Sequence, residues 1–529
     1  MIDEERKKYK PTIPKDLINL SAVSFAKSDP TSCMGDQEQI QSQFSSLFGE
    51  PIIKISSDTQ KSDSISMKIG VVFSGGQASG GHNVICGLFD AIGEMNPKSE
   101  LFGFIGGPSG IVENQYKKLE KEDVDFVRNM GGFDLIGSGR TKIETDDQLK
   151  SSLETAKKLK LDAIIVIGGD DSNTNAAFLA QYFLDNGCTT SVIGVPKTID
   201  GDLRNDQVEI SFGFDTACKC YSEMISNIER DAISAKKYYH FIKLMGRSAS
   251  HIALECALNT HPNFTVIGEE VKEKKMTLDQ IVSDICDMIV KRSEMDHNFG
   301  VVLIPEGLIE FIPEMEVLIG ELNSILAKNP TDPISDLSSE AKKTFQSIPK
   351  SIQDQLLLDR DPHGNVQVSH ISTEKLISQS VKEKLKQWEG YKGKFSPVEH
   401  FFGYEGRAAF PSNFDATYCY ALGRVAALLA KKKLTGYMAL VKNLTKKSVE
   451  WVPCGVPIVS MMNMEIRKGK SKPVIRKSLV DLNSKSFKTF ANSREEWMFE
   501  PCYNYVGSIQ YFGPESVTDQ IPKIVQLEG

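Results

Sequence analysis

Two pairs of carboxylates stand where they could bind a cation or move a proton. Asp170 and Asp171 adjoin one another in GGDDSN, and Asp200 and Asp202 lie two residues apart in PKTIDGDLRN. Carboxylates this close repel each other unless a metal ion or another positive charge is near. Taken singly, the first pair also fits a helix cap and the second an ordinary turn. Together they favour a Mg²⁺ site in which one aspartate also accepts a proton.

Glycine-rich and basic segments of the chain could bind a phosphate-like anion. SGGQASGG (74–81) contains four glycines, so backbone N–H groups could approach an anion without obstruction by a Cβ atom. Arg140 in GSGRTK could donate two hydrogen bonds to phosphate oxygens, and Lys197 adds a second cation. Each pattern alone also fits simple packing or a solvated turn. Four such loops in one chain favour a site for a polyphosphate and Mg²⁺.

These loops follow runs of residues with the pattern of a buried strand. Such runs occupy 67–73, 162–169 and 191–196, and helical patterns follow at 84–95 and 170–183. Strands that alternate with helices in units of this size predict a parallel sheet covered on both faces. Ligands of such sheets bind at the carboxyl ends of the strands, which is where the candidate residues fall.

A second series of strand and helix patterns begins at residue 238. Strands are predicted at 238–246, 263–268 and 298–307, with a helix at 277–292. Residues 308 to about 394 are charged, helical in pattern and poor in strand signals, which indicates a helical insertion. We therefore predict an α/β fold of two doubly wound parallel-sheet domains, with a helical insertion and an N-terminal extension.

The domain boundaries are predicted from these changes of pattern. An N-terminal extension is predicted at 1–65 and ends in the linker-like SSDTQKSDSIS (56–66). A first domain follows at 66–237 and is completed by C-terminal segments. A second domain at 238–430 carries the insertion, and a region at 431–529 packs back on the core.

Composition narrows the class of protein. The chain has 529 residues, and 62 Lys and Arg against 70 Asp and Glu give a net charge of −8, which disfavours a nucleic-acid surface. The first residues lack the apolar core of a secretion signal, and no window has the ~18 apolar residues of a membrane span. The ten cysteines are scattered without a C-x-x-C pair, which predicts reduced thiols. We expect a cytoplasmic protein that binds neither membranes nor nucleic acid.

The motifs resemble, in type and order, those of the phosphofructokinase family, and more closely its long, pyrophosphate-dependent branch. In chain order they are SGGQASGGHN, GSGRTK, GGDDSN, PKTIDGD, SFGFDTA, LMGRSASH, IPEG and GYEGR. The resemblance covers about residues 66 to 425. It implies a glycolytic phosphotransferase that moves a phosphoryl group reversibly from pyrophosphate to the C1 hydroxyl of fructose 6-phosphate, giving fructose 1,6-bisphosphate and phosphate.

The resemblance also implies roles for the residues around the carboxylate pairs. Asp200 would accept the proton of the C1 hydroxyl, and Thr198 would hydrogen-bond the transferring group. Asp170 and Asp202 would be associated with Mg²⁺. These roles suit phosphoryl transfer, because that reaction needs placement and charge stabilisation more than covalent chemistry.

Two further groups of residues would bind the substrates. Those implied for the phosphoryl donor are Gly75, Gly76 and Arg140. Those implied for the sugar phosphate are Met245, Gly246, Arg247, Glu306, Tyr404 and Arg407. Outside these motifs, the methionine would be interpreted as a core residue, and the glutamate and tyrosine as turn or interface residues.

Asp171 and Lys197 bear on the choice of phosphoryl donor. Relatives that use ATP typically have glycine at both positions. Asp171 would fill the space of the nucleotide's α-phosphate and ribose with negative charge, whereas Lys197 would offer a cation to a compact diphosphate. The resemblance thus implies pyrophosphate. An ATP-dependent 6-phosphofructokinase and a non-catalytic regulatory subunit stay open as alternatives.

Three positions depart from the family pattern. Ser79 replaces a common proline, which should change the stiffness of the turn more than its chemistry. Tyr238 and Val398 stand where relatives have arginines. In those relatives the arginine at the position of Val398 reaches the site from a neighbouring subunit. No second contact to the 6-phosphate is therefore assigned. A shared site would imply at least a dimer, and we expect a homo-oligomer, either a dimer or a tetramer.

Overall fold

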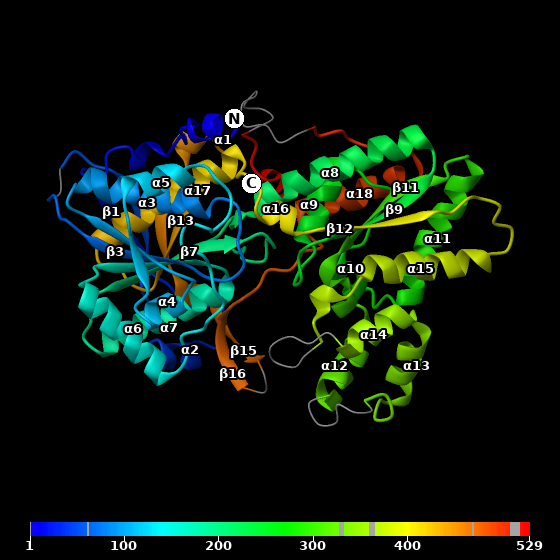
Figure 1. Ribbon diagram of the computed structural model, residues 1–529, viewed down its shortest axis with the longest axis horizontal. Helices are drawn as coiled ribbons and strands as arrows, with labels where there is room; N and C mark the ends of the chain where they lie inside the picture. The colour runs from blue at the N-terminus through cyan, green and yellow to red at the C-terminus, as the bar shows by residue number, and fades with distance from the viewer. Residues whose placement is uncertain (1, 61–62, 327–332, 359–365, 468–469, 508–518) are drawn as a thin grey trace.

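Two β-sheets organise the chain, and they lie side by side with helices around each (Figure 1). The structure is a computed structural model that describes residues 2–60, 63–326, 333–358, 366–467, 470–507 and 519–529. The strands at the centre of both sheets are parallel. The predicted α/β fold class, with two parallel-sheet domains, is therefore confirmed.

The first sheet has a parallel centre and antiparallel edges. Its order is β1-β2-β14-β13-β7-β6-β3-β4-β5, and β8 pairs with β7. The pairs from β13 to β4 are parallel, whereas β14, β2, β1 and β5 join antiparallel. The strands are β1 Val23–Pro30, β2 Pro51–Ser57, β3 Lys68–Phe73, β4 Glu100–Phe104, β5 Tyr116–Leu119, β6 Ala163–Gly168, β7 Ser191–Thr198, β8 Phe212–Gly213, β13 Tyr437–Lys442 and β14 Val452–Pro457.

Alternating apolar residues explain why helices cover both faces of this sheet. In β3, Ile69 and Val71 belong to one core and Val72 to the other, because successive side chains of a strand point to opposite faces. The first core includes helices α3 (Gly81–Met95) and α17 (Asn413–Lys431), and the second includes α6 (Asp146–Leu159) and α7 (Asp170–Asp185). The shorter helices of this part are α1 Ile2–Lys7, η1 Lys15–Leu17, α2 Gln37–Gln43, α4 Ser109–Val112 and α5 Lys121–Val127.

The second sheet is wholly parallel, in the order β10-β11-β9-β12. Its strands are β9 Tyr238–Leu244, β10 Phe264–Thr265, β11 Phe299–Pro305 and β12 Pro397–Phe402. The helices around it are α8 Phe214–Ala235, α9 His251–Thr260, α10 Gly268–Glu273, α11 Leu278–Glu294 and α15 Thr373–Lys386. The strand predicted at 263–268 is only two residues long, since the chain already turns into α10 at Gly268.

One apolar core runs through both domains. It contains Ile69 of the first sheet, Ile242 of the second, and residues of α8 and α9 between them, such as Tyr221 and Ala253. All four side chains are at most 1 % exposed. A shared core of this kind fixes the two sheets relative to each other.

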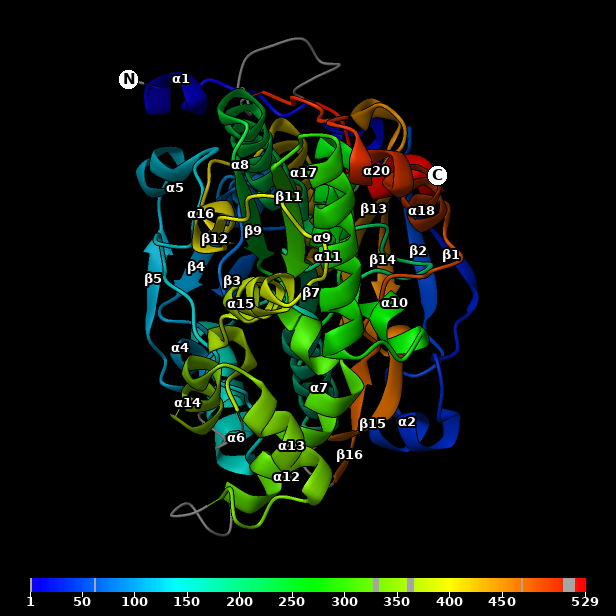
Figure 2. The ribbon, with the colours of Figure 1, turned by 90° about the vertical axis from the view of Figure 1, so that its right-hand side faces the viewer.

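The segment predicted as a helical insertion divides into two parts. Helices α12 (Pro313–Leu326), α13 (Ser339–Ser347) and α14 (Lys350–Leu358) lie below the second sheet in Figure 2. Helix α15 instead packs on β9 and β12, and the buried Lys243 of β9 pairs with Glu374 of α15 at 3.4 Å. We therefore propose that α15 is the crossover helix of the second domain and that α12–α14 are the insertion proper. The short helices η2 Glu306–Glu310 and η3 Val368–His370 flank this segment.

Both ends of the chain contribute to the domains. Strands β1 and β2 from the N-terminal segment, and β13 and β14 from the C-terminal region, extend the first sheet. We propose a first domain assembled from three separate pieces of chain: the N-terminal segment, residues 66–237 and the C-terminal region. The linker-like stretch predicted at 56–66 begins inside β2, because Ser56 and Ser57 still pair with β1, and residues 61–62 lie outside the described part. The remaining elements are α16 Tyr404–Arg407, η4 Ser448–Glu450, η5 Ile458–Met461, β15 Met462–Arg467, β16 Lys470–Ile475, α18 Lys485–Phe499 and α20 Lys523–Glu528.

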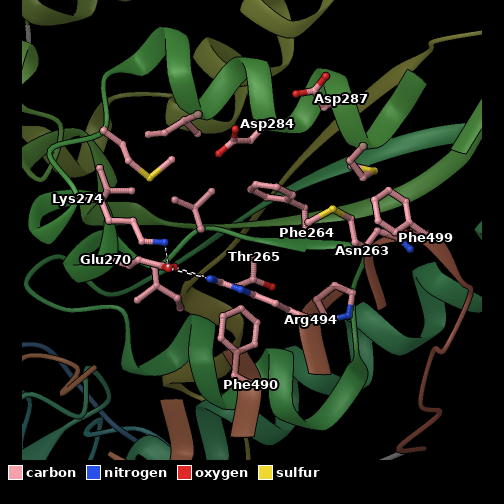
Figure 3. Close-up of a pocket in the computed structure, with 18 of the residues that line it drawn as sticks. Asn263, Phe264, Thr265, Glu270, Lys274, Asp284, Asp287, Phe490, Arg494 and Phe499 are labelled. Atoms are coloured by element: carbon pink, nitrogen blue, oxygen red, sulfur yellow. Dashed lines mark hydrogen bonds and ion pairs between the residues drawn. The ribbon is translucent and has the colours of Figure 1, made fainter. Parts of the chain in front are cut away.

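Helix α18 packs on the second domain and covers a cavity of about 290 Å³ (Figure 3). Arg494 of α18 donates two hydrogen bonds to the Glu270 carboxylate of α10, at 2.6 and 2.8 Å, and Lys274 donates a third at 2.7 Å. Apolar side chains such as Phe264 and Phe490 line the space together with further charged ones, Asp284 and Asp287. The cavity is therefore bounded by α18 and the second domain.

Two sequence predictions concern membranes and thiols. Within the ranges that the structure describes, no helix combines the length and apolar character needed to cross a bilayer. All ten cysteines are free thiols in the structure, and seven of them are buried. Burial raises the pKa of the Cys86 thiol to about 12, which keeps it protonated at neutral pH.

Arg292 fastens the C-terminal region to the second domain from inside the protein. Its guanidinium is completely buried and donates to the carbonyl of Phe299 at the start of β11, at 2.9 and 3.2 Å. It also donates to the carbonyls of Met498 and Phe499 at the end of α18, at 3.2 and 2.7 Å. One buried side chain therefore satisfies three carbonyl groups, of which those of Met498 and Phe499 are part-buried.

The change Arg292→Ala should lower the free energy of unfolding by about 3 kcal/mol, because three carbonyls lose their donor and a cavity forms at a fully buried side chain. Urea unfolding followed by tryptophan fluorescence would measure the loss. The exposed Arg230 is the matched control, since Arg230→Ala should cost less than about 1 kcal/mol. Equal losses in the two variants would contradict the anchoring role of Arg292.

Candidate active site

The predicted site residues gather at the carboxyl ends of neighbouring strands. In the first sheet, β3, β6 and β7 lie next to one another, and the loops that leave them carry Gly75, Asp170 and Asp200. In the second sheet, β9, β11 and β12 are likewise neighbours and lead into Met245 and Glu306, and into the motif that contains Arg407. The two groups of loops meet, because the Arg407 Nε donates to the Gln77 carbonyl at 3.2 Å.

The glycine turn after β3 is shaped by two close approaches. Gly75 has φ of 87°, and its N–H donates to the Gly139 carbonyl at 2.8 Å, which fixes the turn beside the loop of Arg140. A Cβ atom on Gly76 would lie 1.7 Å from the Arg407 Nη2, so a side chain there would require the guanidinium to shift. The glycines therefore bring the backbone of the first domain against a cation of the second.

Four cationic side chains lie close enough to influence one another. The buried Lys197 donates from Nζ to the Gly76 carbonyl at 2.7 Å. Burial, and next the charge of Arg407, lower the pKa of Lys197 to about 8. Burial and the charges of Arg247 and Arg407 also lower the pKa of Arg140. Cations that repel one another in this way form a ready site for a polyanion.

Asp200 lies among groups that hold its proton more tightly than usual. Burial, and next the charge of Asp202, raise the pKa of Asp200 to about 7. The Asp200 N–H donates to the Thr198 Oγ1 at 3.1 Å, which fixes the two residues of the loop relative to each other. A carboxylate with a pKa near neutrality suits proton transfer at physiological pH.

A lysine from the C-terminal region lies between the two predicted metal ligands. The Lys477 Nζ is 3.2 Å from the Asp202 Oδ2 and 3.8 Å from the Asp170 Oδ2. Sequence reasoning missed this residue, because it stands in no motif and follows an irregular stretch of chain. Its ammonium occupies the place that a bound cation would take between the carboxylates.

The donor set fits Mg²⁺. Asp170 and Asp202 offer hard carboxylate oxygens around a position where a positive charge already sits. In the described part of the chain no group of three or more His, Cys, Asp or Glu side chains is arranged to hold a metal ion. Mg²⁺ commonly uses one or two carboxylates and completes its shell with substrate phosphates and water.

Asp171 forms an ion pair with Lys142. Its Oδ1 lies 3.4 Å from the Nζ of Lys142, which belongs to GSGRTK, and both side chains are about half exposed. Lys197 instead points to the glycine turn. The side chain of Asp171 thus stands at the start of α7 with its own partner.

The residues implied for the sugar phosphate are brought together on the second domain. The buried Glu306 accepts a hydrogen bond from the Gly246 N–H at 2.9 Å, and Gly246 has φ of 136°. Met245 is 8 % exposed and contacts Arg407 through its sulfur. Tyr404 is 65 % exposed, with the guanidinium of Arg407 5.7 Å from its ring centroid. Tyr404 and Arg247 are both exposed and lie at the margin of the group.

The chain was compared with known protein families, with curated proteins and with solved structures. A family described as "Phosphofructokinase" matches residues 68–429. A relative from Treponema pallidum named "Pyrophosphate--fructose 6-phosphate 1-phosphotransferase" is 49 % identical over all of this chain and 97 % of its own. A subunit beta 2 of that name from Arabidopsis thaliana is 51 % identical over 96 % of this chain and 90 % of its own.

A solved structure adds the fold. The structure titled as a pyrophosphate-dependent phosphofructokinase from Marinobacter aquaeolei has a TM-score of 0.55 and 15 % identity, and covers 83 % of this chain and 93 % of its own. At that identity the likeness bears on the fold alone. The family match spans more than half of the chain, and the relatives cover nearly all of it. The chain therefore belongs to the phosphofructokinase family.

Proposed function

We propose that this chain transfers a phosphoryl group reversibly from pyrophosphate to the C1 hydroxyl of fructose 6-phosphate. The observation that carries the proposal is the meeting of Lys197, Arg140 and Arg407 with the carboxylates of Asp200 and Asp202 where the two domains join. The names of relatives that match the whole chain at about half identity support the same reaction. The enzyme class is a phosphotransferase of glycolysis.

The residues of the chain divide the work as follows. Asp200 accepts the proton of the C1 hydroxyl as the hydroxyl oxygen attacks the phosphorus. Thr198 hydrogen-bonds the transferring group. The cations Arg140 and Lys197 balance the charge of the phosphoryl donor. A Mg²⁺ ion held by Asp170 and Asp202 would neutralise charge on the phosphate oxygens.

The sugar phosphate is held from the second domain. We assign it to Met245, Gly246, Arg247, Glu306, Tyr404 and Arg407. Arg407 contacts the turn of the first domain as well, so it lies where the transferring group passes between the substrates. Such placement supplies a large part of the catalysis in reactions of this type.

Asp171 is the residue that we assign to donor selection. Its side chain stands at the start of α7 with Lys142 opposite, and it would place a negative charge against the α-phosphate of ATP. Pyrophosphate has no group at that position. An ATP-dependent kinase and a non-catalytic subunit remain the alternatives, and the intact Asp200, Asp202, Arg247 and Arg407 favour a catalytic chain.

The proposed reaction also bears on the cellular compartment and the binding partners of the enzyme. We assign it to the cytoplasm, with pyrophosphate and fructose 6-phosphate as its small-molecule partners. We assign it no nucleic-acid or membrane partner. The ten free thiols agree with a reducing compartment.

The change Asp200→Ser should reduce kcat by about 10²–10⁴-fold, because a positioned base contributes that much. The KM for fructose 6-phosphate should change less than about twofold, since Asp200 is not assigned to the sugar phosphate. A coupled assay with pyrophosphate and Mg²⁺ would measure both. Asp206→Ser, at an exposed position of the same loop, is the control. Equal turnover in the two variants would refute the role.

The change Asp171→Gly, alone and with Lys197→Gly, should raise turnover with ATP at least about tenfold, because the charge that repels the nucleotide is removed. The ratio of kcat/KM for ATP and pyrophosphate is the measurement. Asp146→Gly, at the corresponding start of α6, is a matched control and should leave the ratio unchanged. Wild-type turnover that is equal with both donors would contradict the assignment.

Tyr238 and Val398 lie at the opposite end of the strands from this chain's own site. Tyr238 lies six positions before Leu244 at the end of β9, a distance of about 20 Å at 3.3 Å per residue. We therefore propose that these positions serve the site of a second copy of the chain, in a homodimer or homotetramer. The strand that carries Val398, β12, is an edge of its sheet, and Phe401 on it is 37 % exposed.

Light scattering on the purified protein should give a mass of at least two chains at micromolar concentration. Phe401→Glu should shift that mass toward one chain, because it places a charge on the exposed edge strand. The exposed Phe126 of α5 is the control, and Phe126→Glu should leave the mass unchanged. A wild-type mass of one chain would contradict the oligomer.

A further inference from the structure

A short segment after β16 crosses from the first domain to the second. We call residues 476–480 the strap; in Figure 1 the chain passes here from the β15–β16 hairpin towards α18. The Ser478 N–H donates to the Asp202 carbonyl at 2.8 Å, and the Val480 N–H donates to the Glu269 carboxylate at 2.9 Å. Backbone hydrogen bonds therefore hold the strap to both domains.

The strap places one side chain in the candidate active site. The Lys477 ammonium lies 3.2 Å from Asp202 and 3.8 Å from Asp170, and it donates to the Ser248 Oγ at 2.9 Å. Ser248 directly follows Arg247, one of the residues assigned to the sugar phosphate. Lys477 thus joins the metal ligands of the first domain to the substrate loop of the second.

Lys477 carries a positive charge in the site. Two carboxylate oxygens within 4 Å, one each from Asp170 and Asp202, favour its ammonium form. An ammonium and a divalent ion cannot both occupy the short space between the same two carboxylates, because like charges at close range repel strongly. Free Mg²⁺ must therefore displace Lys477 to bind there.

The ammonium of Lys477, once displaced, can move only as far as its side chain reaches from the strap. The strap is held by its backbone, whereas the side chain of a lysine is long and flexible. The side chain of Lys477 is 33 % exposed, so it has open space on one side. Phosphate oxygens that arrive with the metal ion would offer the ammonium new partners beside the carboxylates.

We propose that Lys477 determines the form in which the metal enters the site: its ammonium excludes free Mg²⁺ from Asp170 and Asp202, and moves onto pyrophosphate oxygens when the metal arrives as its pyrophosphate complex. This inference rests on the proposed function for the identity of the polyanion. No proton is transferred and no covalent bond forms or breaks in this step, since the ammonium stays charged and only exchanges its anionic partners.

The test compares binding of the bare metal with use of its pyrophosphate complex. In Lys477→Met, the affinity for free Mn²⁺, a spectroscopic substitute for Mg²⁺ titrated by electron paramagnetic resonance without substrate, should rise at least tenfold. The KM for Mg²⁺-pyrophosphate should rise at least tenfold as well, because the ammonium contact is lost. The KM for fructose 6-phosphate should stay within about twofold of wild type.

Two further variants make the result specific. Lys477→Arg keeps the charge and should keep the Mn²⁺ affinity within threefold of wild type. Lys472→Met removes a lysine of β16 that pairs with Glu144 at the surface, and should change neither the metal affinity nor any KM. If Lys477→Met does not fold, as judged by thermal unfolding, Lys477→Gln is measured in its place.

The outcomes separate this inference from the proposed function. Unchanged Mn²⁺ affinity in the neutral variants would overturn the exclusion of free metal, whatever the enzyme catalyses. A KM for fructose 6-phosphate that rises as much as that for pyrophosphate would show damage to the strap and would also overturn it. A wild-type enzyme that lacks turnover with pyrophosphate would refute the proposed function, while the binding of Mn²⁺ alone would still decide whether Lys477 excludes the metal.

Discussion

The structure depends on holding like charges close together at the place where two sheets meet. Lys197, Arg140 and Arg407 repel one another on one side, as Asp200 and Asp202 do on the other. Burial first, and this repulsion next, shift the pKa values of Lys197 and Asp200. Neither group would stay in place on a mobile surface. The ends of neighbouring parallel strands, fixed by a core that continues through both domains, supply the rigid frame.

The close approach between Gly76 and Arg407 shows how the frame and the chemistry are linked. A side chain at position 76 would displace the guanidinium that contacts the turn of the first domain. The glycine therefore acts less as a flexible hinge than as a space reserved for a cation. A strand, a turn and a residue more than 300 positions later in the chain are thus parts of one binding surface.

Much of this arrangement could be predicted from the sequence because it obeys local rules. Buried strands followed by glycine or aspartate predict a parallel sheet with ligands at one edge, and Asp170 and Asp200 lie there. Lys477 and the pairing of Asp171 with Lys142 could not be predicted, since both depend on how distant segments pass one another. Strands β1 and β2 were not predicted for the same reason: β2 joins the sheet through β14, about 400 residues later in the chain, and β1 pairs with β2.

The first sheet is completed late in the chain, which has a consequence for its synthesis. Strand β7 ends at Thr198, and its neighbour β13 begins only at Tyr437. At 5–20 residues per second, a ribosome needs roughly 10–50 s to make the segment between them. For that time the backbone groups of β7 that later pair with β13 have no partner strand, which makes this edge a site where the nascent polypeptide could aggregate.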